Sequence, residues 1–151
     1  GGGLGIAACA DLRLADQKAT FSIPAAKLGI GYNPRWVPPL LALAPAAFVK
    51  EMLFTGRRFS ASEALGIGLV NSLVDTDMLE VAVRTLAADI AANAPLSVRA
   101  AKLTVNELLR HPEHPDTATL DAAVKACFDS ADYAEARRAF LEKRKPAFEG
   151  R

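Results

Sequence analysis

The sequence predicts an α/β protein in which a short opening that contains strands is followed by a mostly helical remainder. Two observations lead to this prediction. Apolar residues alternate or run together over residues 11–15 and 19–23, as in short strands. After Pro45, alanine-rich stretches place their apolar residues three and four positions apart, which is the period of a helix. The change between these two patterns is the one organisational boundary in the chain.

The expected elements follow from local signals along the chain. Residues 6–10 suit a short buried helix, and the glycines and prolines of residues 24–36 predict an irregular loop. Ser60 and Glu63 have the spacing of a capping box, which fixes the start of a helix at 61–67. Residues 69–74 read as a strand. Further helices are expected at residues 46–54, 78–92, 96–109, 120–128 and 133–143.

Composition limits the classes of protein to which the chain can belong. Its 151 residues suffice for one folded unit, and 51% hydrophobic with 23% charged residues is typical of a globular protein. A net charge of +1 provides no general attraction for nucleic acid or an anionic membrane, and no apolar run is long enough to span a bilayer. The widely separated Cys9 and Cys127 suit a reducing, cytoplasmic compartment. Because the chain opens on glycines without Met, we expect a fragment of a longer protein.

Few side chains suggest chemistry by themselves. Glycines 1–3 precede a helical run, so they are either turn and packing residues or a place where backbone N–H groups hold an oxyanion or carbonyl oxygen. His111 and His114 stand between prolines in a helix-terminating loop, which argues against a metal site. Cys9 and Cys127 are expected to pack in the core.

Cations at residues 143–145 near a helix end either stabilise that helix or capture phosphate.

Several segments, taken together and in order, resemble the crotonase (enoyl-CoA hydratase/isomerase) superfamily. The resemblance runs from residue 1 to 151 but covers only the C-terminal portion of a typical member. The matching segments are residues 1–4, 11–15, 19–24, 27–29, 53–57, 63–64, 68–71, 132–133 and 138–144.

The resemblance implies a crotonase-like (ClpP/crotonase) fold that is truncated at its N-terminus. Residues 1–74 would be the C-terminal part of the ββα-spiral core, and residues 75–151 a helical oligomerisation region. Members of the family form trimers, often paired as hexamers. We therefore expect a homotrimer or hexamer, with an acyl-CoA thioester as the small-molecule partner.

The resemblance also implies roles for individual residues. The N–H of Gly2 would be one of two backbone donors that polarise the thioester carbonyl, and the other would lie on the absent N-terminal segment. Gly5 and Ala25 occupy the positions of the two glutamates that family hydratases use, and neither can transfer a proton. Tyr32 and Arg35 are the nearest polar candidates for a substituted chemistry, or they serve in packing.

In the family, a Phe and a Lys near the C-terminus reach the coenzyme A in a neighbouring subunit's site. Here these residues are Phe140 and Lys143, and a point-charge lysine suits a phosphate. The resemblance implies no metal, and no cofactor other than the coenzyme A of the substrate.

Three functions remain open from the sequence. The first is an enzyme of the enoyl-CoA hydratase/isomerase type, a lyase or isomerase that stabilises a thioester enolate. The second is a non-catalytic acyl-CoA-binding subunit or pseudoenzyme, which the loss of both glutamates favours. The third is a fragment that only oligomerises through its helices, or that does not fold stably alone.

Overall fold

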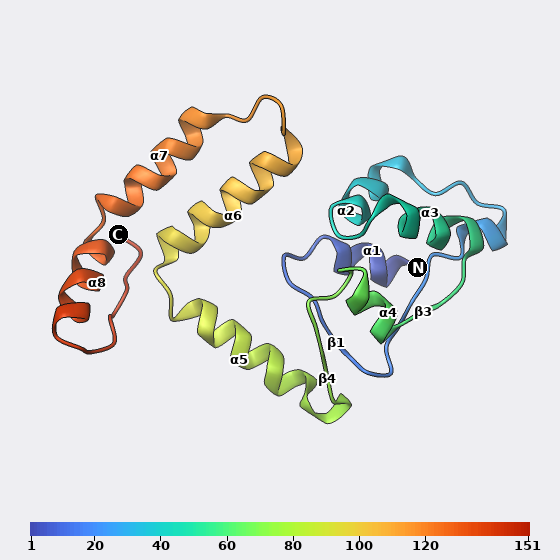
Figure 1. Ribbon diagram of the computed structural model, residues 1–151, viewed down its shortest axis with the longest axis horizontal. Helices are drawn as coiled ribbons and strands as arrows, with labels where there is room; N and C mark the ends of the chain where they lie inside the picture. The colour runs from blue at the N-terminus through green and yellow to red at the C-terminus, as the bar shows by residue number, and fades with distance from the viewer. The chain divides into compact units, whose positions relative to one another are not determined.

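The computed structural model describes residues 1–151. The chain forms two compact units, Gly1–Val83 and Arg84–Arg151, and the boundary between them falls within helix α5 (Leu79–Ala91). The first is called the N-terminal unit and the second the helical unit, and each is described by itself (Figure 1). No helix of the structure has both the length and the apolar composition needed to span a membrane.

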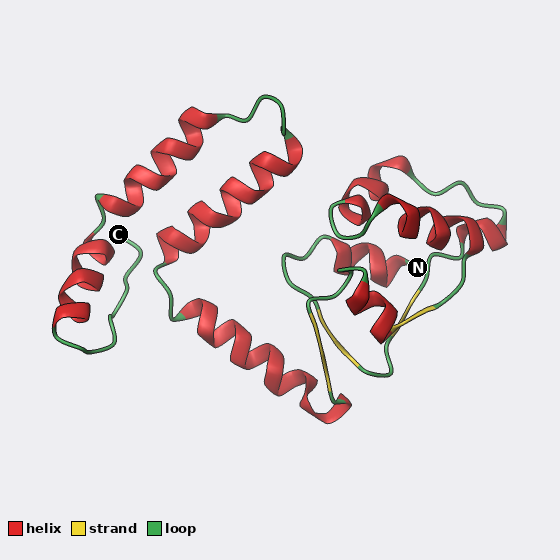
Figure 2. Cartoon of the chain, viewed as in Figure 1, coloured by secondary structure: helices red, strands yellow, loops and turns green.

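All strands of the structure belong to the N-terminal unit, where they form two small sheets (Figure 2). Strand β1 (Leu14–Asp16) pairs in parallel with β4 (Ser72–Val74), and β2 (Thr20–Phe21) pairs antiparallel with β3 (Phe59–Ser60). The strands expected at residues 11–15, 19–23 and 69–74 are therefore present but shorter. Their bounds depend on partners about 40 to 60 residues away, which local sequence does not reveal.

The first helix differs from its prediction. Helix α1 spans Gly2–Ala8 rather than residues 6–10. Leu4 and Ala8 are buried because residues four apart share one helix face, whereas Ile6 falls on the opposite face and is 79% exposed. The expectation of a helix buried along residues 6–10 was wrong for this reason.

Residues 24–36 form an irregular connection that contains two 3₁₀ turns, η1 (Ala25–Leu28) and η2 (Pro34–Trp36). The following helix α2 (Val37–Leu41) was not expected, since Pro38 and Pro39 act as helix breakers in most positions. Both prolines stand in the first turn, where no intrahelical N–H bond is lost.

Helices α3 (Ala46–Thr55) and α4 (Ala61–Gly66) confirm the local signals for their ends. Gly56 ends α3 with φ of 55°, and a Cβ on it would lie 3.1 Å from the Cα of Pro24, so both the turn and the close approach require glycine. The capping box is present, because the Ser60 hydroxyl accepts from the Glu63 amide while the Glu63 carboxylate accepts from the Ser60 amide.

These elements enclose one apolar core in the N-terminal unit. Its most completely buried large side chains come from two elements and two connecting segments. They are Phe59 of β3, Leu40 of α2, Ile23 between β2 and η1, and Leu69 between α4 and β4. The core positions α1 and η1, which carry most of the candidate site.

The helical unit contains the end of α5, followed by α6 (Pro95–Arg110), α7 (Thr117–Phe128) and α8 (Ala131–Leu141). Each of these four helices begins and ends within three residues of the bounds that the sequence predicts. Asp116 caps α7 and Ser130 caps α8 by accepting hydrogen bonds from backbone amides. After α8, residues 142–151 turn back along that helix, and the C-terminus ends beside its first turn (Figure 1). We call residues 143–151 the tail.

Candidate active site

The start of α1 presents backbone N–H groups that the chain itself does not use. Gly2 and Gly3 are the first two residues of the helix, and their amides donate to no group of the chain, whereas the Leu4 amide already donates to the Gly1 carbonyl at 3.0 Å. All three glycines are exposed, and a Cβ added to any of them would meet nothing within 4 Å. A ligand oxygen can therefore approach the Gly2 amide closely.

The sequence positions that the resemblance assigns to the two missing glutamates lie on neighbouring elements. Gly5 is half-buried in α1, and Ala25 is the half-buried first residue of η1, packed against the core. The Gly1 nitrogen donates to the Ser22 carbonyl, so the start of α1 lies beside the strand end that leads to Ala25. A Cβ at Gly5 would meet nothing within 4 Å, so this position has unfilled space in front of it.

Tyr32 lies near the other end of α1. It packs against the core and meets Trp36 edge-on, with ring centroids 5.6 Å apart. Burial, and to a smaller extent the nearby Cys9, raises the pKa of Tyr32. The phenol therefore keeps its proton at neutral pH and can donate it, but it cannot serve as a base there.

Arg35 and Cys9 are both on the surface. The Arg35 side chain is exposed, and its guanidinium group forms no hydrogen bond or ion pair. The backbone amide of Arg35 donates to the Asn33 side chain at 2.9 Å. Cys9 is exposed at the end of α1, with its thiol donating to the Gly5 carbonyl at 3.4 Å. The expectation that Cys9 packs in the core was wrong, because the chain leaves α1 at this residue.

Phe140 and Lys143 belong to the helical unit, at the end of α8. Phe140 is 83% exposed, and the exposed Lys143 forms no ion pair. Lys143 has φ of 53°, the left-handed conformation that glycine usually occupies after a helix. Its position after α8 nonetheless agrees with a cation near the helix carboxyl end.

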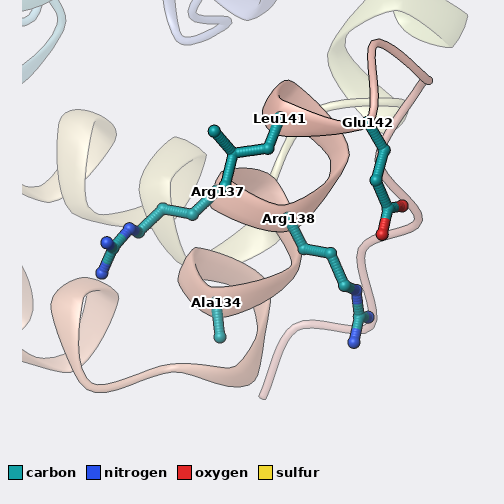
Figure 3. A pocket seen from close by; sticks show the side chains of 5 residues that line it. All are labelled: Ala134, Arg137, Arg138, Leu141 and Glu142. Carbon is teal, nitrogen blue, oxygen red and sulfur yellow. The ribbon is translucent and has the colours of Figure 1, made fainter.

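A hollow of about 320 Å³ opens on the side of α8 (Figure 3). Arg137 and Arg138 extend from different sides of the helix around it, and Ala134, Leu141 and Glu142 complete its lining. Arg138 is paired with Glu135, and Arg137 lies over the Tyr133 ring with 5.9 Å to its centroid. Neither Phe140 nor Lys143 lines the hollow, so it does not extend the pair of residues expected to bind coenzyme A.

Sequence reasoning missed two carboxylates of α8 that hold the tail. Asp132 is only 3% exposed and accepts from the Glu149 and Gly150 amides, and Glu135 accepts from Arg144 and the Ala147 amide. Asp132 stands in the first turn of α8, where the helix dipole alone ordinarily explains an aspartate. The sequence around it therefore did not indicate that it binds the tail.

The structure brings together no group of three or more His, Cys, Asp or Glu side chains that could hold a metal ion. His111 and His114 are exposed beyond the end of α6.

Comparison with known proteins shows the family to which the chain belongs. The profile of the enoyl-CoA hydratase/isomerase family matches residues 1–151. Carnitinyl-CoA dehydratase of Salmonella typhi is 37% identical over 155 residues, a match that covers 100% of this chain and 59% of the dehydratase. The chain thus spans about three fifths of the length of the curated relatives that it matches.

Solved structures agree with the sequence comparison. An enoyl-CoA hydratase/carnithine racemase from Magnetospirillum magneticum matches with a TM-score of 0.93 and 35% identity, over 100% of this chain and 56% of that one. An enoyl-CoA hydratase/isomerase from Mycobacterium paratuberculosis matches with a TM-score of 0.91 and 29% identity, over 100% and 60%. The chain therefore has the crotonase fold and belongs to the enoyl-CoA hydratase/isomerase family.

Proposed function

We propose that the protein containing this chain processes an acyl-CoA thioester by stabilising its enolate. The observation that carries the proposal is the family match over all 151 residues, together with 37% identity to a carnitinyl-CoA dehydratase. The exposed, unpartnered Gly2 amide supports it, because an acyl-CoA enzyme of this kind needs a fixed donor for the thioester oxygen.

The Gly2 N–H would act when charge develops on the thioester oxygen. As a proton leaves the carbon next to the carbonyl, or as water adds to an enoyl double bond, negative charge moves onto that oxygen. A backbone donor already held in place stabilises this charge without reorganising, and the loss of one such donor typically lowers the rate about 10²- to 10³-fold. The second donor is proposed to lie outside this chain, and the only cofactor involved is the coenzyme A of the substrate.

The proton-transfer groups would differ from the two-glutamate arrangement. Gly5 and Ala25 have no group that gives or takes a proton. The Tyr32 phenol is protonated at neutral pH and can donate a hydrogen bond, although its raised pKa makes it a weaker acid than a free tyrosine. Arg35 is the other polar candidate of the same connection. A lyase or isomerase of this family without either glutamate needs its base from elsewhere.

Phe140 and Lys143 would contact the coenzyme A bound at a neighbouring subunit. Both side chains are exposed and Lys143 forms no ion pair, which leaves its ammonium group available to a phosphate.

This role requires an oligomer, and we propose the homotrimer or hexamer. Exposed apolar side chains on α6 and α7, among them Val105, Leu109 and Phe128, support association through the helical unit. Sedimentation of the full-length protein as a monomer at micromolar concentration would contradict this part of the proposal.

The second candidate is a non-catalytic acyl-CoA-binding subunit. Gly5 and Ala25 favour it specifically, since the site would then hold the thioester without moving protons.

One experiment separates the two candidates. The full-length protein is incubated with a panel of acyl- and enoyl-CoA thioesters that includes crotonyl-CoA and carnitinyl-CoA, and products are followed by mass spectrometry while calorimetry reports binding. Product from any thioester supports the enzyme, and binding without product supports the binding subunit. A protein that neither binds nor converts any member of the panel contradicts both.

The Gly2→Pro variant tests whether turnover depends on the Gly2 N–H. Proline is well tolerated as the first residue of a helix, and it replaces the N–H with a ring carbon that cannot donate a hydrogen bond. Turnover should fall about 10²-fold or more in Gly2→Pro, whereas Gly3→Ala, whose added Cβ meets nothing within 4 Å, should keep it. Equal turnover in wild type and Gly2→Pro would remove Gly2 from the mechanism.

A further inference from the structure

The tail is bound along α8 by carboxylates on one side of the helix. At the first turn, Asp132 accepts from the Glu149 amide at 2.7 Å and from the Gly150 amide at 2.9 Å, and its own amide donates to the Arg151 carbonyl at 3.2 Å. With 3% exposure, this carboxylate is shielded from water. The far end of the tail is therefore fixed to the start of the helix.

One turn further along, Glu135 binds the near end of the tail. Its Oε1 accepts from Arg144 Nη1 at 2.6 Å and from the Ala147 amide at 3.2 Å, and its Oε2 accepts from Arg144 Nη2 at 3.1 Å. Its side chain is only 12% exposed. These hydrogen bonds, joined by one from Arg138, lower the pKa of Glu135 to about 2, so the carboxylate is charged at any physiological pH.

Lys143 lies between these contacts and the end of α8, in a conformation that lysine rarely adopts. Its amide donates to the Phe140 carbonyl at 3.2 Å, and the Arg144 amide donates to the Ala139 carbonyl at 3.0 Å. This pattern is a left-handed helix end, which glycine or asparagine normally occupies. A lysine with φ of 53° is disfavoured locally, so neighbouring contacts have to maintain it.

We infer that Glu135 is a positioning residue that acts through Arg144 and the tail to hold Lys143 in this left-handed turn. The turn directs the chain back along α8 and leaves the Lys143 ammonium group unpaired on the surface, one turn from the exposed Phe140. The proposed contact of Lys143 with a phosphate of coenzyme A rests on the proposed function. The maintenance of the turn by Glu135 does not, and it can be measured without ligand.

The ligand-free test is a thermodynamic cycle of four full-length proteins: wild type, Glu135→Gln, Lys143→Gly and the double variant. Glycine removes the local cost of the left-handed turn, so Lys143→Gly should raise the melting temperature by about 2–4 °C in the wild-type background. Without the Glu135 charge the tail no longer holds the turn, and Lys143 can leave the left-handed conformation. Lys143→Gly should therefore raise the melting temperature only slightly in the Glu135→Gln background. Equal gains in both backgrounds would overturn the inference.

Glu142→Gln is the matched control for this cycle. The Glu142 carboxylate also accepts from Arg144, at 2.6 Å from Nε, but unlike that of Glu135 it accepts no hydrogen bond from a backbone amide of the tail. The gain from Lys143→Gly should persist in the Glu142→Gln background, and its loss there would contradict a specific role for Glu135. If Glu135→Gln does not fold, Arg144→Gln breaks the same pair from the other side and enters the cycle in its place.

The second readout is affinity for coenzyme A, measured by calorimetry on the full-length protein. Glu135→Gln should weaken binding about fivefold, and it should have no further effect once Lys143→Ala has removed the ammonium group. An equal loss in both backgrounds would show that Glu135 does not act through Lys143. If Lys143→Ala binds coenzyme A as wild type does, the proposed contact with phosphate fails, while the melting cycle still decides the inference.

Discussion

At the scale of single residues, Arg13 is a charged residue that the N-terminal unit buries. The residue is 8% exposed, its Nε donates to the Leu69 carbonyl at 2.8 Å, and its Nη1 donates to the Ala10 carbonyl. Because a truncated side chain would leave these carbonyls without partners, Arg13→Ala should lower the free energy of unfolding by about 2 kcal/mol or more.

Urea denaturation measures this loss, with Arg35→Ala as the control. Arg35 is exposed and forms no ion pair, so its truncation should change the free energy of unfolding by less than about 0.5 kcal/mol. Similar losses in the two variants would show that the buried contacts of Arg13 do not stabilise the fold.

Gly5 and Ala25 give a residue-scale test of the proposed chemistry. A Cβ at Gly5 meets nothing within 4 Å, and α1 tolerates a longer side chain there since glutamate is a better helix former than glycine. The double substitution Gly5→Glu with Ala25→Glu should therefore raise the hydration rate of crotonyl-CoA, by about 10²-fold for each general acid or base restored.

Absorbance of the enoyl thioester follows this reaction, and the matched control is Gly5→Gln with Ala25→Gln, which fills the same space without a carboxyl group. A rise in the glutamine control equal to that in the glutamate variant would mean that packing rather than proton transfer is responsible. No rise in either would contradict the assignment of these two positions.

At the scale of elements, the start of α4 depends on its capping box. The Ser60 hydroxyl accepts from the Glu63 amide at 3.2 Å, and the Glu63 carboxylate accepts from the Ser60 amide at 2.7 Å. Ser60→Ala should cost about 1 kcal/mol in the free energy of unfolding. The Ser62 hydroxyl forms a hydrogen bond with the Ser60 hydroxyl, at 3.1 Å, and accepts none from a helix amide. Ser62→Ala should therefore cost clearly less when both variants are measured by chemical denaturation. A larger cost for Ser62→Ala would contradict the capping role.

The attachment of the tail to α8 should depend on pH. Hydrogen bonds from Arg144, then from Arg138 and the Ala147 amide, lower the pKa of Glu135 from 4.5 to about 2. A carboxyl group whose pKa is lower in the folded state contributes stability above its unfolded pKa and loses it as pH falls through the folded value. This contribution should therefore be complete above about pH 5 and be lost progressively as pH falls to the folded pKa of about 2 and below.

Melting temperatures of wild type and Glu135→Gln across this range measure the effect. The difference between the two proteins should be constant from pH 7 to about pH 5 and should shrink as pH approaches 2. A difference that does not change over this interval would show that the Glu135 charge contributes nothing to the tail's attachment.

At the scale of the whole molecule, the sequence predicts best what depends on nearby residues. The helices of the helical unit lie within three residues of their predicted bounds, and the capping box at Ser60 and the glycine stop at Gly56 are confirmed, because each signal is read over a few neighbouring positions. The predicted strand lengths were wrong because the length of β1 depends on its pairing with β4, about 58 residues away, which local sequence does not show.

The candidate site was predictable only in part. The resemblance of residues 1–151 to a family pointed to Gly2, Gly5 and Ala25, and the structure adds that the Gly2 amide is exposed and unpartnered. The role of Glu135 could not be predicted, since it arises only when Arg144 and the tail fold back on α8. Local patterns do not contain such a contact.

The polarisation of a bound thioester carbonyl is the property on which the proposed function of the molecule depends. Isotope-edited infrared spectroscopy of crotonyl-CoA labelled with ¹³C at the carbonyl measures it directly in the full-length protein. Hydrogen bonds to the oxygen lengthen the C=O bond, so binding should lower its stretching frequency in wild type and less so in Gly2→Pro. A carbonyl band that stays at its solution frequency, or one that shifts equally in wild type and Gly2→Pro, would contradict the proposed role of Gly2.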